Sequence, residues 1–422
     1  MDGRSISVTA PESAGAPARG RRAPLVGPRR AGAVFVLLAV APSCGRPPRS
    51  VGGAEARLEA TLVEVVAGRR TTPLVEQPVP GGDATVTFLV KGSDGLAPRI
   101  VSDATGWGER TADNSFDLTV GRMSRIGSSD WYRLETRVAS GARVEYLIVN
   151  GESDYRIDPH NPRQATFHGA DPVSEFVTPD YVPPREFTDP PPAPTGRTTE
   201  ATIASRALGG SRRVIVYTPA GYRADGTYPV AVFHSGWGAA QEGGAARVLD
   251  WLIVHREIEP IVAVFLESHI AGDLDNREGG PMRTFLIVEV PAWLAAHYGV
   301  TASPEERAIL AISYGAKDAL DAALAPNGAY GRLGLLIPGR RLRPADLDAV
   351  AGQRGRRLRA TILAGRYDAA NLATARDARR ALADAGHAVD YIEVPEGHNP
   401  ATWRNHLGAV LVSLFGRAGV AR

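Results

Sequence analysis

One serine stands where a reactive hydroxyl could be held. Ser313 lies in the segment AILAISYGAKDAL, directly after an apolar run typical of a strand and before a helical pattern. Ala311 and Gly315 lie two residues to either side, and a sharp strand-to-helix turn needs small residues there because larger side chains would collide. Such a turn exposes the serine oxygen and predicts a nucleophile elbow, although Ala311 replaces the usual first glycine. A helix N-cap is the structural alternative.

Two further residues supply the partners that a nucleophilic serine needs. Asp368 lies in the loop GRYD that overlaps the end of the run ATILAG, and His398 lies in PEGHNPATW after the run from Val389 to Val394. The chain order Ser, Asp, His is that of α/β-hydrolases, and each candidate follows a different predicted strand. We therefore predict that His398 accepts the proton of Ser313 and that Asp368 holds the imidazole in one tautomer. Taken singly, Asp368 could equally cap a helix and His398 could be an ordinary loop residue.

Backbone N–H groups near this serine could stabilise the negative charge that develops on an ester carbonyl oxygen. The elbow itself supplies the N–H of Tyr314. The second donor of the oxyanion hole is expected in the loop HSGWG after the run PVAVF, where Gly236 or Trp237 is the candidate. The indole of Trp237 would then lie at the mouth of the pocket, or it would cover the core. His234, in the same loop, is a weaker candidate for substrate binding.

Alternating apolar and helical segments after residue 200 predict the scaffold for these groups. Short runs such as RVIVY, PVAVF and IVAVFL alternate with helical patterns near Ala246 to Arg256, Thr284 to Tyr298 and Asn371 to Ala385. Nearly continuous apolar strands are typical of a mostly parallel sheet that is covered by helices on both faces. In such a sheet the catalytic groups lie at the carboxyl ends of the strands. We predict an α/β-hydrolase catalytic domain over residues 200–419.

A smaller all-β domain and a linker precede the catalytic domain. The segments ATVTFLVK, WYRLETR and RVEYLIVN are rich in β-forming residues and are separated by turn residues, whereas no strong pattern emerges from Val51 to Arg70. We predict a β-sandwich over residues 56–180. Six prolines lie in residues 181–199, and this density excludes helix and interior strand. This segment is predicted to be an extended linker.

The beginning of the chain has the order of an export signal. Arginines precede the apolar run AGAVFVLLAVA, which is too short to span a bilayer of about 30 Å, and Pro42, Ser43 and Cys44 follow it. We predict an export signal over residues 1–44. The segment resembles a bacterial lipoprotein signal, and this resemblance implies that Cys44 becomes the lipidated N-terminus. An ordinary cleaved signal or a wrongly assigned start codon is the alternative. The protein is thus expected outside the cytoplasm, secreted or attached to a membrane through Cys44, and in the cytoplasm if the segment is not a working signal.

Charge and composition exclude several classes of function. The formal net charge is only +2, so there is no basic excess of the kind that nucleic-acid binding requires. The single cysteine excludes an intramolecular disulfide framework and cysteine-rich metal sites. The sequence contains no glycine-rich phosphate loop and no cluster with metal-ligand spacing. We therefore expect no nucleic-acid partner, no metal and no cofactor.

Several strings together resemble one family of enzymes. VIVYTPAGY, HSGWG, LDWLIVHREIEPIVAVFLE, AISYGAKDAL and PEGHNPATWRNHL resemble the enterochelin (siderophore) esterases and the wider esterase D-like group of α/β-hydrolases. The preceding segment, which ends in YRIDPHNPR, resembles the immunoglobulin-like N-terminal domain of enterochelin esterases. By position, the resemblance implies that Ser313 is the nucleophile, His398 the base and Asp368 the acid. It also implies substrate contacts near Glu278, for which a loop carboxylate without that role is the alternative.

These observations predict a serine esterase, with two alternatives left open. The expected reaction is hydrolysis of a siderophore-type or other small carboxylic ester through an acyl-enzyme, and the partner is a small-molecule ester, a siderophore or an acyl ester of the cell envelope. An acyltransferase of the mycolyltransferase type would instead pass the acyl group to a sugar hydroxyl. A non-catalytic envelope lipoprotein would bind glycan through the sandwich and keep a relic hydrolase domain. In such a relic the oxygen of Ser313 would lie more than about 4 Å from His398.

Overall fold

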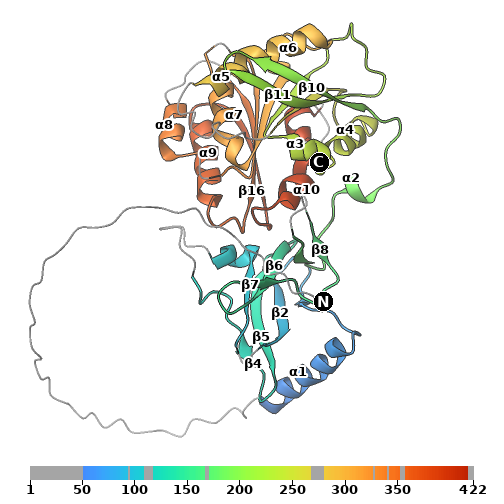
Figure 1. Cartoon of the computed structure of the whole chain (residues 1–422), viewed down its shortest axis with the longest axis vertical. Helices are drawn as coiled ribbons and strands as arrows, with labels where there is room; N and C mark the ends of the chain where they lie inside the picture. Colours follow the sequence, from blue (N-terminus) through green and yellow to red (C-terminus); the bar gives the residue numbers. More distant parts are fainter. Residues whose placement is uncertain are drawn as a thin grey trace, which may run out of the picture. The chain divides into compact units, whose positions relative to one another are not determined.

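The computed structural model describes residues 51–93, 96–108, 117–166, 171–267, 280–326, 328–339, 342–351 and 357–416 (Figure 1). The chain divides after Arg70 into two compact units. The described part of the first unit is the helix α1 (Val51–Val66) with the turn that follows it. Everything from Thr71 onward belongs to the second unit, which contains all of the strands found in the described residues.

An eight-stranded sheet forms the centre of the larger part of this second unit, in the order β10-β11-β13-β12-β14-β15-β16-β17. From β13 to β17 all neighbouring strands are parallel, while β10 and β11 are antiparallel to their neighbours. The strands are β10 (Arg197–Ser205), β11 (Gly210–Thr218), β12 (Val230–His234), β13 (Val262–Leu266), β14 (Arg307–Ile312), β15 (Arg332–Leu336), β16 (Arg359–Gly365) and β17 (Ala388–Val394). This is the mostly parallel α/β sheet that the apolar runs predict.

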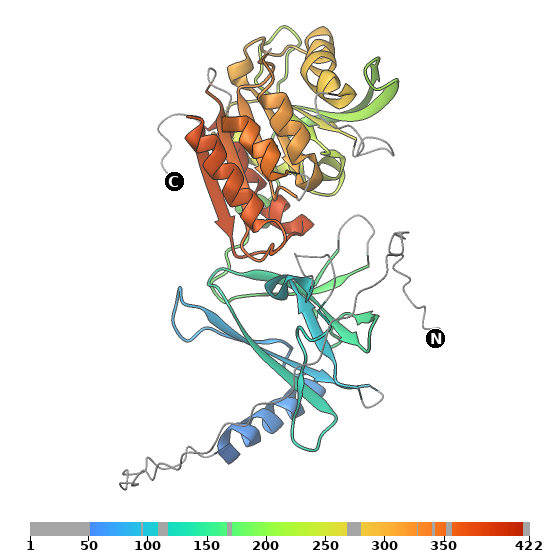
Figure 2. The same cartoon turned by 90° about the vertical axis from the view of Figure 1, so that its left-hand side faces the viewer.

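Helices cover both faces of this sheet, as Figures 1 and 2 show. Residues alternate between two cores along β14: Ile309 and Ala311 pack in one, Ala308 and Leu310 in the other. The first core is shared with α5 (Pro281–Thr284), η3 (Phe285–Glu289), α6 (Val290–His297), α7 (Ala316–Ala323), α8 (Pro344–Ala351) and α9 (Leu372–Asp384). The second is shared with α3 (Trp237–Gln241), α4 (Ala245–Val254) and α10 (Pro400–Phe415). Two buried faces explain why the strands read as continuous apolar runs.

Two antiparallel sheets with one common core form the smaller part of the second unit. Their orders are β1-β2-β5-β4 and β3-β6-β9-β8, with β7 paired to β6. The strands are β1 (Leu74–Glu76), β2 (Ala84–Lys91), β3 (Arg99–Ser102), β4 (Ser124–Arg125), β5 (Trp131–Val138), β6 (Arg143–Asn150), β7 (Asp154–Arg156), β8 (Gln164–Ala165) and β9 (Val173–Val177). Phe88, Tyr146 and Phe176 meet edge-on or tilted between the sheets. We call this part the sandwich; its immunoglobulin-like character stays a prediction.

Two segments differ from the expectations for the N-terminal half. Helix α1 occupies the region without a strong pattern and includes residue 56, so the sandwich begins later, with β1 at Leu74. The segment 181–199 contains a short helix, α2 (Arg185–Thr188), and the start of β10 at Arg197. The expectation that its prolines exclude helix is wrong for these four residues. None of them is a proline, and Pro184 lies just before the helix, where its missing N–H costs nothing.

Candidate active site

The end of β14 forms the sharp turn that the sequence predicts. Ser313 follows this strand, opens the short helix η5 (Ser313–Gly315), and has a φ of 49°, a left-handed conformation that is unfavourable for a residue with a side chain. A Cβ at Gly315 would lie 2.9 Å from Cδ2 of His234 and 3.2 Å from Cβ of Ala311. Because Gly315 lacks that atom, Ala311 can carry a methyl group where the elbow motif usually has glycine.

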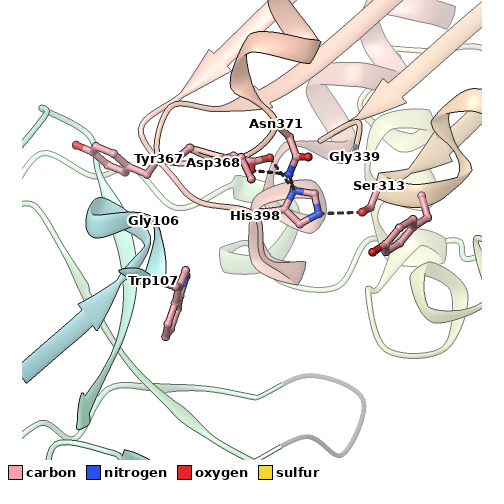
Figure 3. Close-up of a pocket in the computed structure, with 11 residues that line it drawn as sticks. Gly106, Trp107, Ser313, Gly339, Tyr367, Asp368, Asn371 and His398 are labelled. Carbon is pink, nitrogen blue, oxygen red and sulfur yellow. Dashed lines mark hydrogen bonds and ion pairs between the residues drawn. The ribbon is translucent and has the colours of Figure 1, made fainter. Parts of the chain in front are cut away.

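Three side chains from different strand ends form a hydrogen-bonded series beside this turn (Figure 3). Oγ of Ser313 lies 2.8 Å from Nε2 of His398, and Nδ1 of His398 lies 2.6 Å from Oδ2 of Asp368. Ser313 follows β14, Asp368 follows β16 and His398 follows β17, so all three lie at carboxyl ends of parallel strands. Asp368 is buried, whereas the side chain of His398 is 32% exposed. The arrangement allows an imidazole to receive a serine proton while a carboxylate holds its other nitrogen.

Two residues next to these three side chains were not predicted from the sequence. Nδ2 of Asn371 donates to Oδ1 of Asp368 at 2.7 Å, so both carboxylate oxygens of Asp368 have a donor. The sequence assigned Asn371 only to the start of a helix, and its place three residues after Asp368 was the available signal. Gly339 donates its N–H to the carbonyl of Ser313, and a Cβ there would lie 3.2 Å from the Ser313 hydroxyl oxygen. Gly339 therefore leaves room around the reactive oxygen.

The loop after β12 narrows the choice of oxyanion donors. The N–H of Gly236 donates to the carbonyl of Leu266 at 3.1 Å and is thus already engaged. Trp237 opens α3, and the first N–H groups of a helix have no carbonyl partner within that helix. Tyr314, inside the first turn after the elbow, is in the same position in η5. Of the three candidates, Tyr314 and Trp237 are the ones whose N–H groups the local structure leaves available.

Two side chains of the same loop do not line the pocket at Ser313. His234 is 3% exposed, and its Nε2 lies 3.2 Å from Oδ2 of Asp318 in the first turn of α7. It therefore connects the end of β12 to the helix behind the elbow, and its role in substrate binding stays a prediction. The indole of Trp237 packs on the core and lies under the guanidinium of Arg213 at 4.5 Å, which is the core-covering alternative for this residue.

A cavity of about 500 Å³ opens beside the three hydrogen-bonded side chains. Its lining includes Ser313, His398 and the largely exposed Tyr314 from the α/β part, and Gly106 and Trp107 from the sandwich. Its size is in the range of pockets that take small organic ligands. The sequence interpretation did not include Trp107, because no pattern near it points to a site.

A buried carboxylate of the sandwich lies next to the loop that carries His398. Asp103 is 1% exposed, and its Oδ2 accepts a hydrogen bond from Nδ2 of Asn399 at 3.0 Å. Burial, together with the nearby charge of Glu145, raises the pKa of the Asp103 carboxyl to about 7, against the opposing effects of the hydrogen bonds from the Glu145 N–H and from Trp107 and of the charge of Arg143. The sandwich thus places an ionisable group in direct contact with the residue after His398.

Some predicted residues lie outside the described part of the chain, namely Cys44 and Glu278. Within the described ranges, no group of His, Cys, Asp and Glu side chains is arranged to hold a metal ion. Among those same residues, no helix combines the length and the apolar character needed to cross a bilayer.

The parallel sheet, the turn at Ser313 and the polar residues at its strand ends define the class of α/β-hydrolase folds. Residues 205–414 match the model of the Esterase family, described as "Putative esterase", and the chain belongs to this family. The protein is accordingly a carboxylic ester hydrolase. No curated protein matches the chain.

Solved structures of enterobactin esterases share the fold over most of the chain. The ferric enterobactin esterase of Salmonella typhimurium is 19% identical with a TM-score of 0.64, and the match covers 83% of this chain and 98% of that one. The enterobactin esterase of Shigella flexneri, solved in the presence of enterobactin, is 20% identical with a TM-score of 0.62, covering 82% and 96%. At this identity the similarity establishes the fold.

Proposed function

We propose that the protein hydrolyses its ester through Ser313, His398 and Asp368. The proton of the Ser313 hydroxyl passes to Nε2 of His398 as the serine oxygen attacks the ester carbonyl carbon. The tetrahedral intermediate then expels the alcohol, which takes that proton from the imidazolium. Water, activated by the same imidazole, attacks the acyl-enzyme and releases the acid. Asp368 accepts a hydrogen bond from Nδ1 throughout and stabilises the positive charge on the ring.

The observation that carries this proposal is the pair of hydrogen bonds at His398. The separations of 2.8 Å to Ser313 and 2.6 Å to Asp368 are both within the range in which a proton can be transferred or a tautomer fixed. With Nδ1–H donated to Asp368, Nε2 carries the lone pair that faces the serine hydroxyl. The donor of Asn371 is then used on Oδ1 of Asp368, at 2.7 Å, rather than on the ring.

We assign the oxyanion hole to the N–H groups of Tyr314 and Trp237. They belong to two turns that follow the adjacent parallel strands β14 and β12. Backbone donors fixed in this way need no reorganisation when charge develops on the carbonyl oxygen. Removal of a single donor of this kind from a serine hydrolase costs about 10²-fold or more in kcat.

The substrate class we propose is a siderophore-type ester or another small carboxylic ester. Support comes from the shared fold with enterobactin esterases, one of which was solved in the presence of enterobactin. The cavity volume of about 500 Å³ suits a small-molecule ester.

The geometry weighs against the non-catalytic alternative. A relic domain was expected to hold the Ser313 oxygen more than about 4 Å from His398, and the separation is 2.8 Å. Acyl transfer to a sugar hydroxyl differs from hydrolysis only in the second nucleophile, so product analysis distinguishes the two.

Hydrolysis of p-nitrophenyl acetate, p-nitrophenyl butyrate and ferric enterobactin by the purified protein tests the proposal. The Ser313→Ala variant is expected to lose at least about 10³-fold in kcat/KM, because no other group can form the acyl-enzyme. Ser211→Ala is the matched control, since Ser211 is an exposed residue of β11 in the same sheet. Equal rates for the wild type and Ser313→Ala would refute the catalytic roles. Rates that rise with added sugar, with acylated sugar as product, would favour acyl transfer.

We also propose that residues 1–44 direct export and that Cys44 becomes lipidated. The support is the order of basic, apolar and small residues in the sequence. Mass spectrometry of the mature N-terminus in the native host is expected to find a diacylglyceryl group on Cys44, and Cys44→Ser is expected to abolish it. An unprocessed N-terminus in the cytoplasmic fraction would refute export.

A further inference from the structure

A short turn of the sandwich reaches into the candidate active site. The segment η1 (Asp103–Gly108) follows β3 and contains three consecutive residues with a positive φ, namely Gly106 with φ 58°, Trp107 with φ 56° and Gly108 with φ 77°. A left-handed conformation is unfavourable for a bulky aromatic residue and persists only where the surroundings enforce it. Here it accompanies a Trp107 side chain that lines the same cavity as Ser313 and His398 (Figure 3).

The indole of Trp107 is fixed by a buried partner. Its Nε1–H donates to Oδ1 of Asp103 at 3.0 Å, and Trp107 is not part of the buried core between the two sheets of the sandwich. The other carboxylate oxygen of Asp103 accepts from the N–H of Glu145 at 2.8 Å and from Nδ2 of Asn399 at 3.0 Å. Asp103 thus links the indole in the cavity to the residue that follows His398.

The same segment touches both loops that carry the proposed catalytic side chains. A Cβ at Gly397, the residue before His398, would lie 1.9 Å from Oδ1 of Asp103. A Cβ at Gly106 would lie 3.0 Å from Cβ of Ala369, the residue after Asp368. These close approaches leave no room for a side chain at Gly397 and little at Gly106, so the segment is seated against both loops.

Asn399 carries the contact onward into the scaffold. Its Oδ1 accepts from the N–H of Thr402 at 3.1 Å, as the N-cap of α10. Its other end is held by Asp103. The loop that carries His398 is therefore fixed between a helix of the α/β part and a carboxylate of the sandwich.

We propose that this segment of the sandwich is part of the active site. Trp107 is a specificity-determining residue that forms the wall against which a planar group of the ester lies, and Asp103 is the positioning residue that fixes this wall and the His398 loop to each other. The indole face suits a flat, unsaturated group because it offers a large rigid surface and favourable ring contacts. This inference rests on the proposed function, since it assigns roles around the same serine.

Four esters that differ only in where they carry a ring test the role of Trp107: ethyl butyrate, ethyl benzoate, phenyl butyrate and phenyl benzoate. Trp107→Gly removes the wall and suits the left-handed backbone. It is expected to lower kcat/KM about tenfold for at least one ring-bearing ester, mainly through KM, and to change ethyl butyrate less than twofold. Trp107→Phe is expected to keep more of the preference. Trp131→Phe is the matched control, because Trp131 is a buried tryptophan of the sandwich that does not line this cavity.

The role of Asp103 is tested by the same panel with a different expected signature. Asp103→Asn and Asp103→Ala are expected to lower kcat for all four esters, about tenfold for the alanine variant, because the change acts through the His398 loop. Because Asp103 also holds the indole of Trp107, the alanine variant is expected in addition to raise KM for the ring-bearing esters. The asparagine variant, which keeps the volume and one acceptor, is expected to retain more of kcat. A loss confined to the melting temperature, with kcat and KM unchanged, would overturn the positioning role.

Including Ser313→Ala separates failure of this inference from failure of the proposed function. If Ser313→Ala is inactive and Trp107→Gly changes all four esters equally, only the role of Trp107 is refuted. If Ser313→Ala stays active, the proposed function fails, and the roles around it fail with it. Selective loss in Trp107→Gly, together with an inactive Ser313→Ala, supports both.

Discussion

Two buried carboxylates hold neighbouring residues of one loop, and they come from different parts of the second unit. Asp368, after β16, accepts from the ring of His398 at 2.6 Å. Asp103, in the sandwich, accepts from the side chain of Asn399 at 3.0 Å. The first contact acts on the imidazole that faces the cavity, and the second acts on the loop from behind. The protonation state of the ring and the position of the loop are thus controlled by separate groups. Substitutions of these groups should therefore have different effects.

The two contacts also differ in how deeply their side chains are buried. The side chain of His398 is 32% exposed, whereas Asn399 is 6% exposed and Asp103 is 1% exposed. Buried polar groups are costly when a partner is removed, because water cannot replace it. We therefore expect changes at Asp368 to appear mainly in catalysis and changes around Asp103 to appear in stability and catalysis together.

Asp368→Asn is expected to have the largest catalytic effect. An amide in place of the carboxylate cannot stabilise the imidazolium and favours the tautomer in which Nε2 carries the hydrogen, so kcat should fall about 10³-fold or more. Steady-state kinetics measures the change in kcat, and thermal unfolding measures the change in stability. The free energy of unfolding should change by less than about 2 kcal/mol, since the residue volume is kept.

Asp384→Asn provides the charge-matched control for this variant. Asp384 is an exposed residue at the end of α9, the helix that follows the Asp368 loop. It should behave as the wild type in both measurements. A fall of less than tenfold in Asp368→Asn would break the distinction between ring and loop, because Asp368 would then act no differently from a structural carboxylate.

Gly397→Ala tests the contact between the His398 loop and Asp103, by adding an atom rather than by removing a partner. The added Cβ would lie 1.9 Å from Oδ1 of Asp103, so the loop or the carboxylate must move. We expect a loss of about 1–3 kcal/mol in the free energy of unfolding, as for other overpacked sites. kcat should fall about 10- to 100-fold, because the imidazole is carried on the displaced loop.

Combining Gly397→Ala with Asp103→Ala makes this test specific. The second change removes the atom that clashes, so the double variant should be less destabilised than the sum of the two single changes, by about 0.5–3 kcal/mol. Gly210→Ala is the control, because a Cβ at Gly210 would meet nothing within 4 Å. Strict additivity would show that the crowding at Gly397 does not act through Asp103.

The sequence could predict one side of this comparison and not the other. Ser313 follows an apolar run directly, and Asp368 and His398 lie within four residues of the end of one, so local pattern and chain order were enough to propose them. The contact between Asp103 and Asn399 joins residues 296 positions apart. It depends on how the sandwich packs against the loop, and no local pattern encodes that packing.

The same physical limit explains the smaller differences. Which N–H of the β12 loop is available depends on the carbonyl of Leu266 on the neighbouring strand, which engages Gly236. Helix α1 was missed because several β-branched valines near its end obscure the helical period. The mostly parallel sheet was predicted well, since burial of both strand faces leaves a direct trace in composition.

The pH dependence of stability should carry the mark of Asp103. Its pKa is about 7 in the folded protein, raised by burial and by the charge of Glu145 against the hydrogen bonds from the Glu145 N–H and from Trp107 and the charge of Arg143, and lies near 3.8 without those surroundings. Between these values the folded state retains a proton that the unfolded chain has released. The folded state thus binds more protons, so the free energy of unfolding falls as pH rises from about 4 to 7, by up to about 1.4 kcal/mol per pH unit.

Comparison with Asp103→Asn isolates this contribution. Chemical denaturation of both proteins from pH 4 to 8 gives the difference in unfolding free energy at each pH. The wild type should lose stability relative to the variant across the window and show a constant difference above it. A difference that is flat from pH 4 to 7 would mean that Asp103 is ionised throughout, as a carboxylate with three N–H donors would be if those donors outweighed burial.

Tyr367→Phe should have the smallest effect on kcat of these substitutions. The loop that carries Asp368 also contacts the sandwich, since the hydroxyl oxygen of Tyr367 accepts a hydrogen bond from the N–H of Ala139 at 2.7 Å. This contact is a single neutral hydrogen bond at the turn between β5 and β6, so its loss should cost about 0.5–1.5 kcal/mol. kcat should change less than twofold, because Asp368 keeps its donor from Asn371 within its own part of the chain. A fall in kcat as large as that of Asp103→Ala would show instead that the sandwich positions both loops equally. The position of Asp368 would then depend on the sandwich as much as that of His398 does.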